Sequence, residues 1–331
     1  MDLMANVLIY GAGAVGSLMG YILSQVEGKE VDGRKVNGRD SIENVALLGR
    51  KSHIDLVRED GLKVNLPEGS RHLKFRYCFS KLDQLGGSGF RPDAVIICVK
   101  SPALERVKDE IASFMSRSSA LRDAEFIILM NGMGNRDILI PLIPSISEGI
   151  TSVGIKFSGD GLIEIKGMGK TIFAAGISEK LKSFIRSAFL EKGFEVELVS
   201  AQNFKGQQWM KLITNSAINP LTAILRKENA IVLSDNLRKT VRRVVEECVK
   251  VASKEGLEID SVGALDLVLS VASRTATNTS SMLQDVLKGR KTEINSINGY
   301  VVALGKKHSL DVPVNETLYS LVKVTEQNVE R

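Results

Sequence analysis

Apolar runs of strand length alternate with stretches of helical periodicity in the first part of the chain. The strand-like runs are found at 6–10, 45–48, 94–99 and 125–130, with helical segments between some of them. This alternation is typical of a parallel sheet with connecting helices. The pattern therefore predicts an α/β domain built on a parallel sheet.

Other short runs predict additions to this sheet. Two-residue alternation in GLKVNL and LKFRYC predicts a hairpin between the second and fourth runs. After Pro144 come short strands with glycine turns, which we expect to extend the sheet with antiparallel strands: ITSVGIKF, GLIEIKG, TIFAAG and FEVELV. Residues 27–44 are charged, glycine-rich and nearly free of large apolar side chains, which predicts an exposed loop inserted before the second strand.

Strand signals vanish from about residue 203, and long helical periods replace them. These periods cover 203–219, 235–256, 261–274 and 293–308. A chain of 331 residues is long enough for two domains of ordinary size. We therefore expect an α/β domain over 1–202 and an all-helical domain over 203–331.

Composition narrows the class of protein. A hydrophobic content of 44% is typical of a globular protein, and the longest apolar runs are far shorter than the roughly 20 residues that cross a bilayer. The N-terminus lacks a basic segment followed by an apolar one, so we expect a cytoplasmic protein without membrane association. Cys78, Cys98 and Cys248 are odd in number and widely spaced, which favours reduced core thiols over disulfides or a metal site.

The net charge of +5 does not point to a nucleic-acid partner. Basic residues are interleaved with acids, as in KTVRRVVEECVK, which is typical of the solvated face of an amphipathic helix. We therefore expect no nucleic-acid binding. A modestly basic surface instead favours small anions, such as a dinucleotide phosphate and a carboxylate substrate.

The stretch VLIYGAGAVGSLMGYILSQV, residues 7–26, predicts a strand, a tight turn and the start of a helix. Gly11 permits the turn, Gly13 lets the backbone approach the phosphates, and Gly16 lets the helix pack closely on its strand. A pyrophosphate would then lie at the helix N-terminus, where free N–H groups favour anions. The predicted dinucleotide contacts are Gly11, Ala12, Gly13, Ala14, Val15 and Gly16.

Two positions compete for the residue that reads the ribose 2′ substituent. Asp32 has nearly the spacing at which an acid bonds the 2′-hydroxyl of NAD, but its surroundings, EVDGRKV, are too polar for a buried strand. VALLGRK does resemble a buried strand and ends in Arg50 and Lys51, cations that would pair with the 2′-phosphate of NADP. Arg50 as a plain solvated loop residue remains an open alternative.

Two later turns also follow strands of the predicted sheet. Lys100 comes after the strand at 94–99, with Ser101 as the expected N-cap and Pro102 at the first helical position. Asn131 follows the strand at 125–130 in LMNGMGN. Because strand carboxyl ends line the binding crevice of such sheets, Lys100 is placed to meet cofactor. For Asn131, an ordinary Asn-Gly turn and an amide contact to ligand are equally compatible with the sequence.

The predicted helical domain carries a polar stripe in an apolar segment. Lys211, Asn215 and Asn219 in WMKLITNSAINPLTA are four residues apart and share one helix face. A bound polar ligand and contacts to neighbouring backbone or water are equally compatible with this pattern. A second patch, residues 278–300, would bring Glu293 to the ammonium of Lys211 if it folds over that helix.

These motifs together resemble the ketopantoate reductase (2-dehydropantoate 2-reductase) family over about residues 5–326. The resemblance rests on GAGAVG, VK at 99–100, NGMG, WMKLITNSAINPLTA, SSMLQD, GRKTEI and INGYVVALGKKHSLDVPVNETLYSLVK. It implies an α/β Rossmann-like NADP-binding domain followed by an all-α C-terminal domain of the 6-phosphogluconate-dehydrogenase-like type, with substrate between them. It also implies NADPH-dependent reduction of ketopantoate to (R)-pantoate, a step toward pantothenate and coenzyme A, by a monomer or homodimer.

The resemblance also assigns roles to individual residues. Lys211 matches the proton donor, and Glu293 matches a glutamate at the cofactor and substrate junction. Matches to the remaining contacts are Asn215, Asn219, Asn229 and Ser281 for substrate, Asn131 for substrate and cofactor, and Lys100 and the backbone of Ile155 for cofactor. One departure is Asn295, which stands where the family often has an acid after TEI.

Two other functions remain compatible with the sequence. One is a related reductase of another branched 2-keto acid, or an opine-type dehydrogenase, because the same lysine would serve any 2-oxo carboxylate. The other is a non-catalytic protein that senses NADP and keeps the fold.

Overall fold

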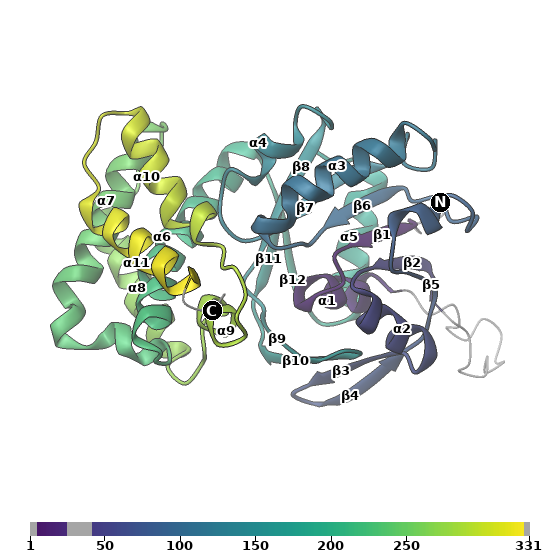
Figure 1. Ribbon diagram of the computed structural model, residues 1–331, viewed down its shortest axis with the longest axis horizontal. Helices are drawn as coiled ribbons and strands as arrows, with labels where there is room; N and C mark the ends of the chain where they lie inside the picture. Colours follow the sequence, from purple (N-terminus) through teal and green to yellow (C-terminus); the bar gives the residue numbers. More distant parts are fainter. Residues whose placement is uncertain (1–4, 25–41, 328–331) are drawn as a thin grey trace. The chain divides into compact units, whose positions relative to one another are not determined.

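The computed structural model describes residues 5–24 and 42–327 (Figure 1). The chain divides into two compact units, of which the first contains Met1–Met130 and Arg136–Phe204 and the second contains Asn131–Asn135 and Lys205–Arg331. Asp32 and most of the predicted loop lie outside the described residues. The loop prediction is wrong at its end, because Ile42 and Asn44 are buried in a strand and the Asn44 Nδ2 donates to the Leu23 carbonyl over 3.0 Å.

The first unit is built on an eight-stranded sheet with the order β12-β11-β8-β7-β6-β1-β2-β5. Its strands are β1 (Val7–Tyr10), β2 (Ile42–Leu48), β5 (Phe75–Phe79), β6 (Ala94–Ile97), β7 (Glu125–Leu129), β8 (Ile146–Thr151), β11 (Lys170–Ala174) and β12 (Glu195–Val199). The six strands from β5 to β8 are parallel, in the order of a Rossmann sheet whose reversal point lies between β1 and β6. The predicted α/β parallel fold is thus confirmed.

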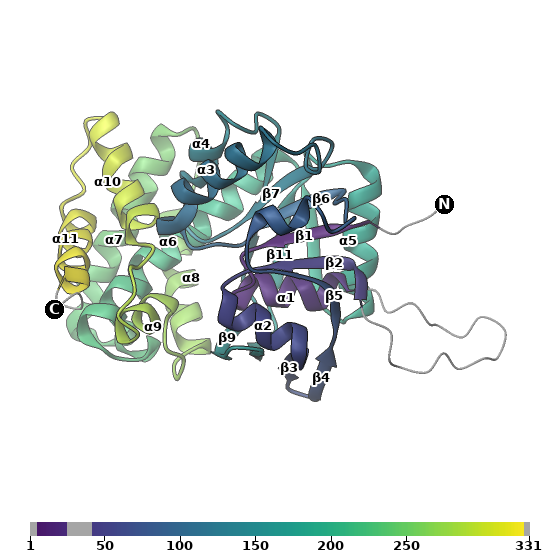
Figure 2. The same cartoon turned by 45° about the vertical axis from the view of Figure 1, so that its right-hand side comes forward.

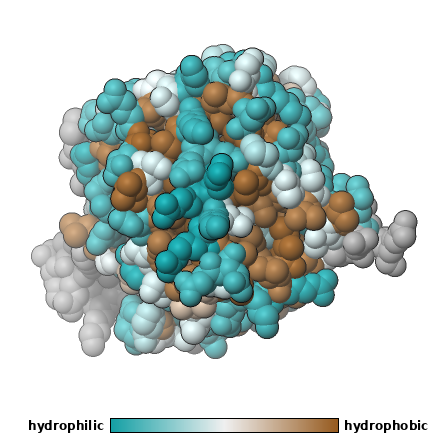
Figure 3. Space-filling model, turned by 90° about the vertical axis from the view of Figure 1, so that its left-hand side faces the viewer, coloured by the Kyte–Doolittle hydropathy of each residue, from teal (hydrophilic) through white to brown (hydrophobic). Residues whose placement is uncertain are grey.

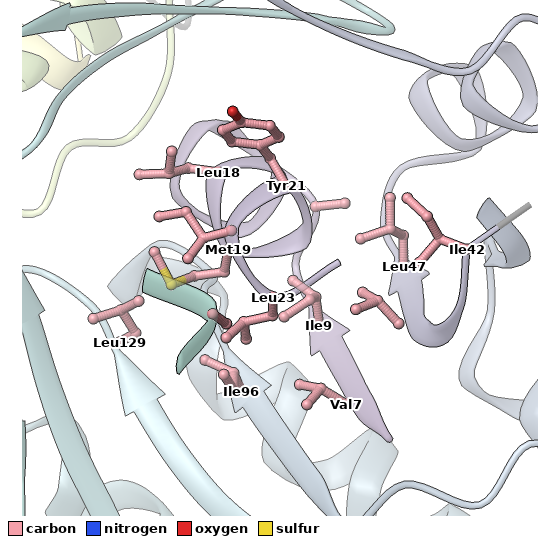
Figure 4. Close-up of a cluster of buried hydrophobic side chains, with 14 of the residues drawn as sticks. Val7, Ile9, Leu18, Met19, Tyr21, Leu23, Ile42, Leu47, Ile96 and Leu129 are labelled. Carbon is pink, nitrogen blue, oxygen red and sulfur yellow. The ribbon is translucent and has the colours of Figure 1, made fainter. Parts of the chain in front are cut away.

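The helices of this unit connect the strands of the sheet. They are α1 (Ala14–Leu23), α2 (Lys51–Glu59), α3 (Leu104–Met115), α4 (Asn135–Leu139) and α5 (Glu179–Glu191). Figure 4 shows how α1 packs on the sheet, with Leu23 beside Ile9 and Ile96 and Met19 beside Leu129. These side chains are almost completely buried, and such burial is the main favourable contribution to folding. The core thus fixes the start of α1 relative to the end of β1.

The predicted extension of the sheet is wrong in part. Strand β8 still pairs in parallel with β7, and only β11 and β12 run antiparallel to the other strands of the eight-stranded sheet. Two of the other segments, β9 (Gly154–Gly159) and β10 (Leu162–Gly167), belong to a second sheet with the order β4-β3-β10-β9. The predicted hairpin between GLKVNL and LKFRYC is also wrong. Strand β3 (Leu62–Leu66) forms a hairpin with β4 (Gly69–Leu73) instead, and FRYC lies in β5, which pairs with β2. The pairing of β10 with β3 joins segments about 100 residues apart, which local alternation cannot specify.

The second unit is helical (Figure 2). Its helices are α6 (Ala201–Leu225), α7 (Arg238–Lys254), α8 (Ser261–Arg274), α9 (Ser281–Leu287), α10 (Asn298–Lys307) and α11 (Pro313–Gln327), and short 3₁₀ turns occupy Asn229–Leu233 and Ile294–Ser296. The first four residues of α6 belong to the first unit. On the face shown in Figure 3, hydrophobic residues form separate groups between hydrophilic ones. An all-helical C-terminal domain was predicted and is confirmed.

Helix α6 continues past the predicted end at residue 219, although Pro220 lies inside it. Proline has no N–H, so the carbonyl four residues earlier loses its helical partner. That carbonyl belongs to Ser216, and it accepts a hydrogen bond from the Asn298 Nδ2 over 3.1 Å. A side chain from α10 therefore replaces the missing bond, which the local sequence of α6 could not reveal.

Candidate functional site

The glycine turn after β1 has the geometry that the sequence predicts for Gly11. Gly11 has a φ of +103°, and a Cβ on it would lie 2.7 Å from the Val99 Cγ1. The N–H groups of Gly11 and Ala12 donate to the Leu48 carbonyl over 2.8 and 2.9 Å. The turn is therefore wedged between the ends of β6 and β2, at the reversal point of the sheet.

The other two glycines of the motif have opposite surroundings. A Cβ on Gly16 would lie 2.1 Å from the Gly11 carbonyl oxygen, so only glycine fits there. A Cβ on Gly13 would meet no atom within 4 Å. Gly13 is the N-cap of α1, and the first helical bond runs from the Ser17 N–H to its carbonyl. The first N–H groups of a helix have no partner within the helix, so the open space beside Gly13 at the start of α1 fits a dinucleotide pyrophosphate.

Arg50 is the N-cap of α2, directly after β2. Its guanidinium carbon lies 5.3 Å from the ring centroid of Phe157, and its Nη2 lies 4.0 Å from the Asp160 Oδ1. Lys51 instead forms an ion pair with Asp55 on the same helix. Of the two predicted cations, Arg50 is thus the one held against the turn between β9 and β10.

The two remaining predicted cofactor residues of this unit, Lys100 and Ile155, lie in different settings. Strand β6 ends at Ile97, earlier than expected, and Lys100 is exposed. Lys100 and not Ser101 occupies the N-cap position of the following 3₁₀ turn, which has proline in its first turn, so that detail of the prediction is wrong. Ile155 lies in β9, paired with Ile165, and is partly buried.

The helical unit brings Asn131 and Glu293 together. The Asn131 Nδ2 donates to the Glu293 Oε2 over 3.2 Å, across 162 residues of sequence. The Met133 N–H donates to the Ser296 carbonyl over 2.8 Å, and a Cβ on Gly132 would lie 2.5 Å from that same oxygen. The 131–135 turn is therefore packed tightly on the segment that carries Glu293.

Lys211 belongs to the same cluster, which we call the lysine cluster: Lys211, Glu293 and Asn131. Its half-buried position in α6 lowers the pKa of its ammonium to about 8, although the negative charge of Glu293 acts in the opposite direction. Glu293 itself is only 5% exposed. A lysine with a pKa near neutrality can both donate a proton and stabilise an oxyanion.

The other predicted substrate residues of this unit differ in burial. Asn215 is half-buried and Asn219 is buried, and both share the face of α6 that carries Lys211. Asn229 is buried, and its Nδ2 donates to the Thr275 Oγ1 over 2.8 Å, but within the described chain its Oδ1 accepts no hydrogen bond. Ser281 is the exposed first residue of α9, whose N-cap is Ser280.

The sequence did not reveal the role of Glu326, which binds Thr292, the residue before Glu293. The N–H and hydroxyl of Thr292 both donate to the Glu326 Oε1, over 2.6 and 2.7 Å. Burial favours the neutral form of Glu326, but hydrogen bonds from Lys323 and Thr292 outweigh it and lower the pKa of this carboxyl. No local pattern in the sequence indicates this contact, because Glu326 lies 34 residues from Thr292, near the end of helix α11.

These observations define a class: a protein with a Rossmann-type dinucleotide-binding unit and a helical unit with a half-buried lysine. Family models refine it. "Ketopantoate reductase PanE/ApbA" matches residues 7–176, and "Ketopantoate reductase PanE/ApbA C terminal" matches residues 203–326. The chain belongs to the ketopantoate reductase PanE/ApbA family, and the predicted resemblance is confirmed.

Individual proteins are similar over nearly the whole chain. A 2-dehydropantoate 2-reductase of Pyrococcus horikoshii is 32% identical over 97% of both chains, and one of Pyrococcus abyssi is 30% identical over 96% of this chain and 97% of its own. Among solved structures, a PanE/ApbA family ketopantoate reductase from Ralstonia eutropha is 26% identical with a TM-score of 0.82, covering 98% of this chain and 100% of its own.

A second solved structure has a different substrate. A ternary structure of D-mandelate dehydrogenase with NADH and anilino(oxo)acetate is 25% identical to this chain, with a TM-score of 0.82, and covers 98% of this chain and 100% of its own.

Over the described residues, no helix is both long and apolar enough to cross a membrane.

Proposed function

We propose that this protein is a 2-dehydropantoate 2-reductase that reduces ketopantoate to (R)-pantoate with NADPH. The observation that carries the proposal is the lysine cluster, a half-buried ammonium of lowered pKa beside a buried carboxylate. The relatives of that name match nearly the whole chain at about 30% identity. The product is a branched hydroxy acid that serves pantothenate and coenzyme A biosynthesis.

The proposed chemistry divides into a step supplied by the cofactor and steps supplied by this chain. A bound nicotinamide supplies a hydride for the ketone carbon. Lys211 protonates the alkoxide oxygen, and its charge favours that oxygen before the proton moves. Glu293 keeps the ammonium protonated by its own charge, and Asn131 orients the Glu293 carboxylate through their hydrogen bond.

Substrate recognition is proposed for four polar residues of the helical unit: Asn215, Asn219, Asn229 and Ser281. Asn229 has the strongest physical support, because a buried acceptor without a hydrogen bond is costly and a ligand hydroxyl would satisfy it. Pantoate and its keto acid carry a hydroxyl donor. A keto acid without one would leave the Asn229 Oδ1 unsatisfied.

The proposed cofactor is NADP(H), held by the glycine turn, Arg50, Lys51, Lys100 and Ile155. Arg50 supports this choice because it lies just after β2, at the position where such folds bind the ribose 2′ substituent. NADH is the specific alternative, because the similar D-mandelate dehydrogenase was solved with NADH.

Initial rates of NADPH oxidation at 340 nm test this proposal. Ketopantoate, 2-oxoisovalerate and benzoylformate, the keto acid of mandelate, should each be supplied with NADPH and with NADH. We expect the highest kcat/KM with ketopantoate and NADPH. A preference for benzoylformate would support a mandelate-type reductase, and tight NADPH binding without turnover of any keto acid would support a sensor.

A further inference from the structure

The β9–β10 turn holds the guanidinium of Arg50 from two sides. The ring of Phe157 lies 5.3 Å from the guanidinium carbon, and the Asp160 carboxylate lies 4.0 Å from Nη2. The Arg50 side chain is 58% exposed and that of Asp160 is 35% exposed. Both charged groups therefore remain accessible to a ligand while they face each other.

A buried histidine fixes this turn in place. The Gly161 N–H donates to the His53 Nδ1 over 3.0 Å, so the ring accepts a bond there and carries its proton on Nε2, toward the Ser17 Oγ at 3.3 Å. Burial lowers the pKa of His53 to about 4, which keeps the ring neutral at physiological pH. Gly161 has a φ of +73°, and a Cβ on it would lie 2.9 Å from a Leu56 methyl group.

The carboxylate of Asp160 affects the two dinucleotides in opposite ways. A 2′-phosphate that pairs with Arg50 comes within a few ångströms of this carboxylate and is repelled by it. A ribose 2′-hydroxyl is a donor that a carboxylate can accept, as acids do in NAD-binding folds. The same residue therefore weakens NADPH binding and supports NADH binding.

We propose that Asp160 is a specificity-determining residue that reduces the preference for NADPH conferred by Arg50. The proposal rests on the proposed function only in placing Arg50 at the ribose 2′ position. It assigns cofactor choice to a pair of opposite charges on different elements, α2 and the β9–β10 turn. The wild-type chain is then expected to bind both dinucleotides, with a modest preference.

The test measures binding without turnover. Dissociation constants for NADPH, NADH and 2′,5′-ADP should be determined by calorimetry for the wild type, Asp160→Asn and Arg50→Ala. The matched control is Glu164→Gln, which removes a negative charge from the same hairpin but from a carboxylate that pairs with Lys166 and Ser158. Asparagine is nearly isosteric and the His53 bond uses backbone, so Asp160→Asn should keep the wild-type melting temperature.

We expect Asp160→Asn to tighten NADPH and 2′,5′-ADP about tenfold relative to NADH, from Coulomb repulsion of a dianion at about 6 Å in water. Glu164→Gln should leave this ratio unchanged. If Asp160→Asn leaves the affinity for NADPH relative to NADH unchanged or lowers it, while Arg50→Ala lowers that relative affinity, the inference is wrong. If Arg50→Ala also has no effect, the placement of Arg50 itself is wrong. Failure to reduce ketopantoate contradicts the proposed function alone, because the binding ratios do not depend on it.

Discussion

The glycine turn of the first unit and the lysine cluster of the second bind by different means. The turn presents backbone: three glycines and the first N–H groups of α1, within six consecutive residues. The lysine cluster presents side chains that come from positions 131, 211 and 293. The glycine turn should be sensitive to the addition of a single side-chain atom, whereas the lysine cluster should be sensitive to the loss of a charge. This difference predicts how each will fail when it is altered.

The largest expected effect is on the lysine cluster. Lys211→Ala should lower kcat by about 10³-fold or more, since it removes both the proton donor and the charge that favours the oxyanion. NADPH binding and the melting temperature should change little. The control is Lys205→Ala, six residues earlier in α6, whose Nζ bonds the Glu255 carbonyl. Near-normal kcat in Lys211→Ala would remove this residue from the mechanism.

The glycine turn should separate folding from binding. Gly16→Ala forces a Cβ to 2.1 Å from the Gly11 oxygen and should destabilise the protein by about 3 kcal/mol or more, measured by urea unfolding. Gly13→Ala meets no protein atom, so its stability should stay near the wild type. Its Kd for NADPH should instead rise about tenfold or more, because the methyl group fills the space that the phosphates need. Equal NADPH affinity in Gly13→Ala and the wild type would move the pyrophosphate elsewhere.

In the first unit, charge should matter most at the ribose 2′ position. Arg50→Ala should lower the NADPH to NADH ratio of kcat/KM by about tenfold, the loss of one charge-assisted contact to a phosphate. Lys51→Ala is the comparison variant and should lower this ratio less than Arg50→Ala does, because Lys51 already pairs with Asp55 on its own helix. A larger effect from Lys51 than from Arg50 would reverse the two assignments.

The smallest predicted effect is a shift in pH dependence. Ketone reduction needs Lys211 protonated, so kcat should fall as pH rises through about 8. Glu293 favours the charged form, and its removal lowers the pKa of Lys211. Glu293→Gln should therefore move this alkaline limb to lower pH, by about one unit. A limb that stays in place, or moves upward, would show that Glu293 does not act on Lys211.

The sequence by itself determined the parts whose physics is local. Glycine spacing after an apolar strand predicted the dinucleotide turn, and helical periodicity predicted the helical domain, including 261–274 at the observed bounds of α8. Lys211, Asn215 and Asn219 were placed on one helix face because the period of a helix is fixed. These features depend on residues within one or two turns of chain.

Only the tertiary structure decided the features that join distant segments. The Asn131–Glu293 hydrogen bond, the pairing of β10 with β3 and the seat of Arg50 on the β9–β10 turn each bring together residues about 100 or more positions apart. Helix α6 tolerates Pro220 because Asn298 donates to the Ser216 carbonyl, which the proline leaves without a helical partner. Such contacts depend on how whole elements pack, and propensity or periodicity carries no information about a partner that lies elsewhere in the chain.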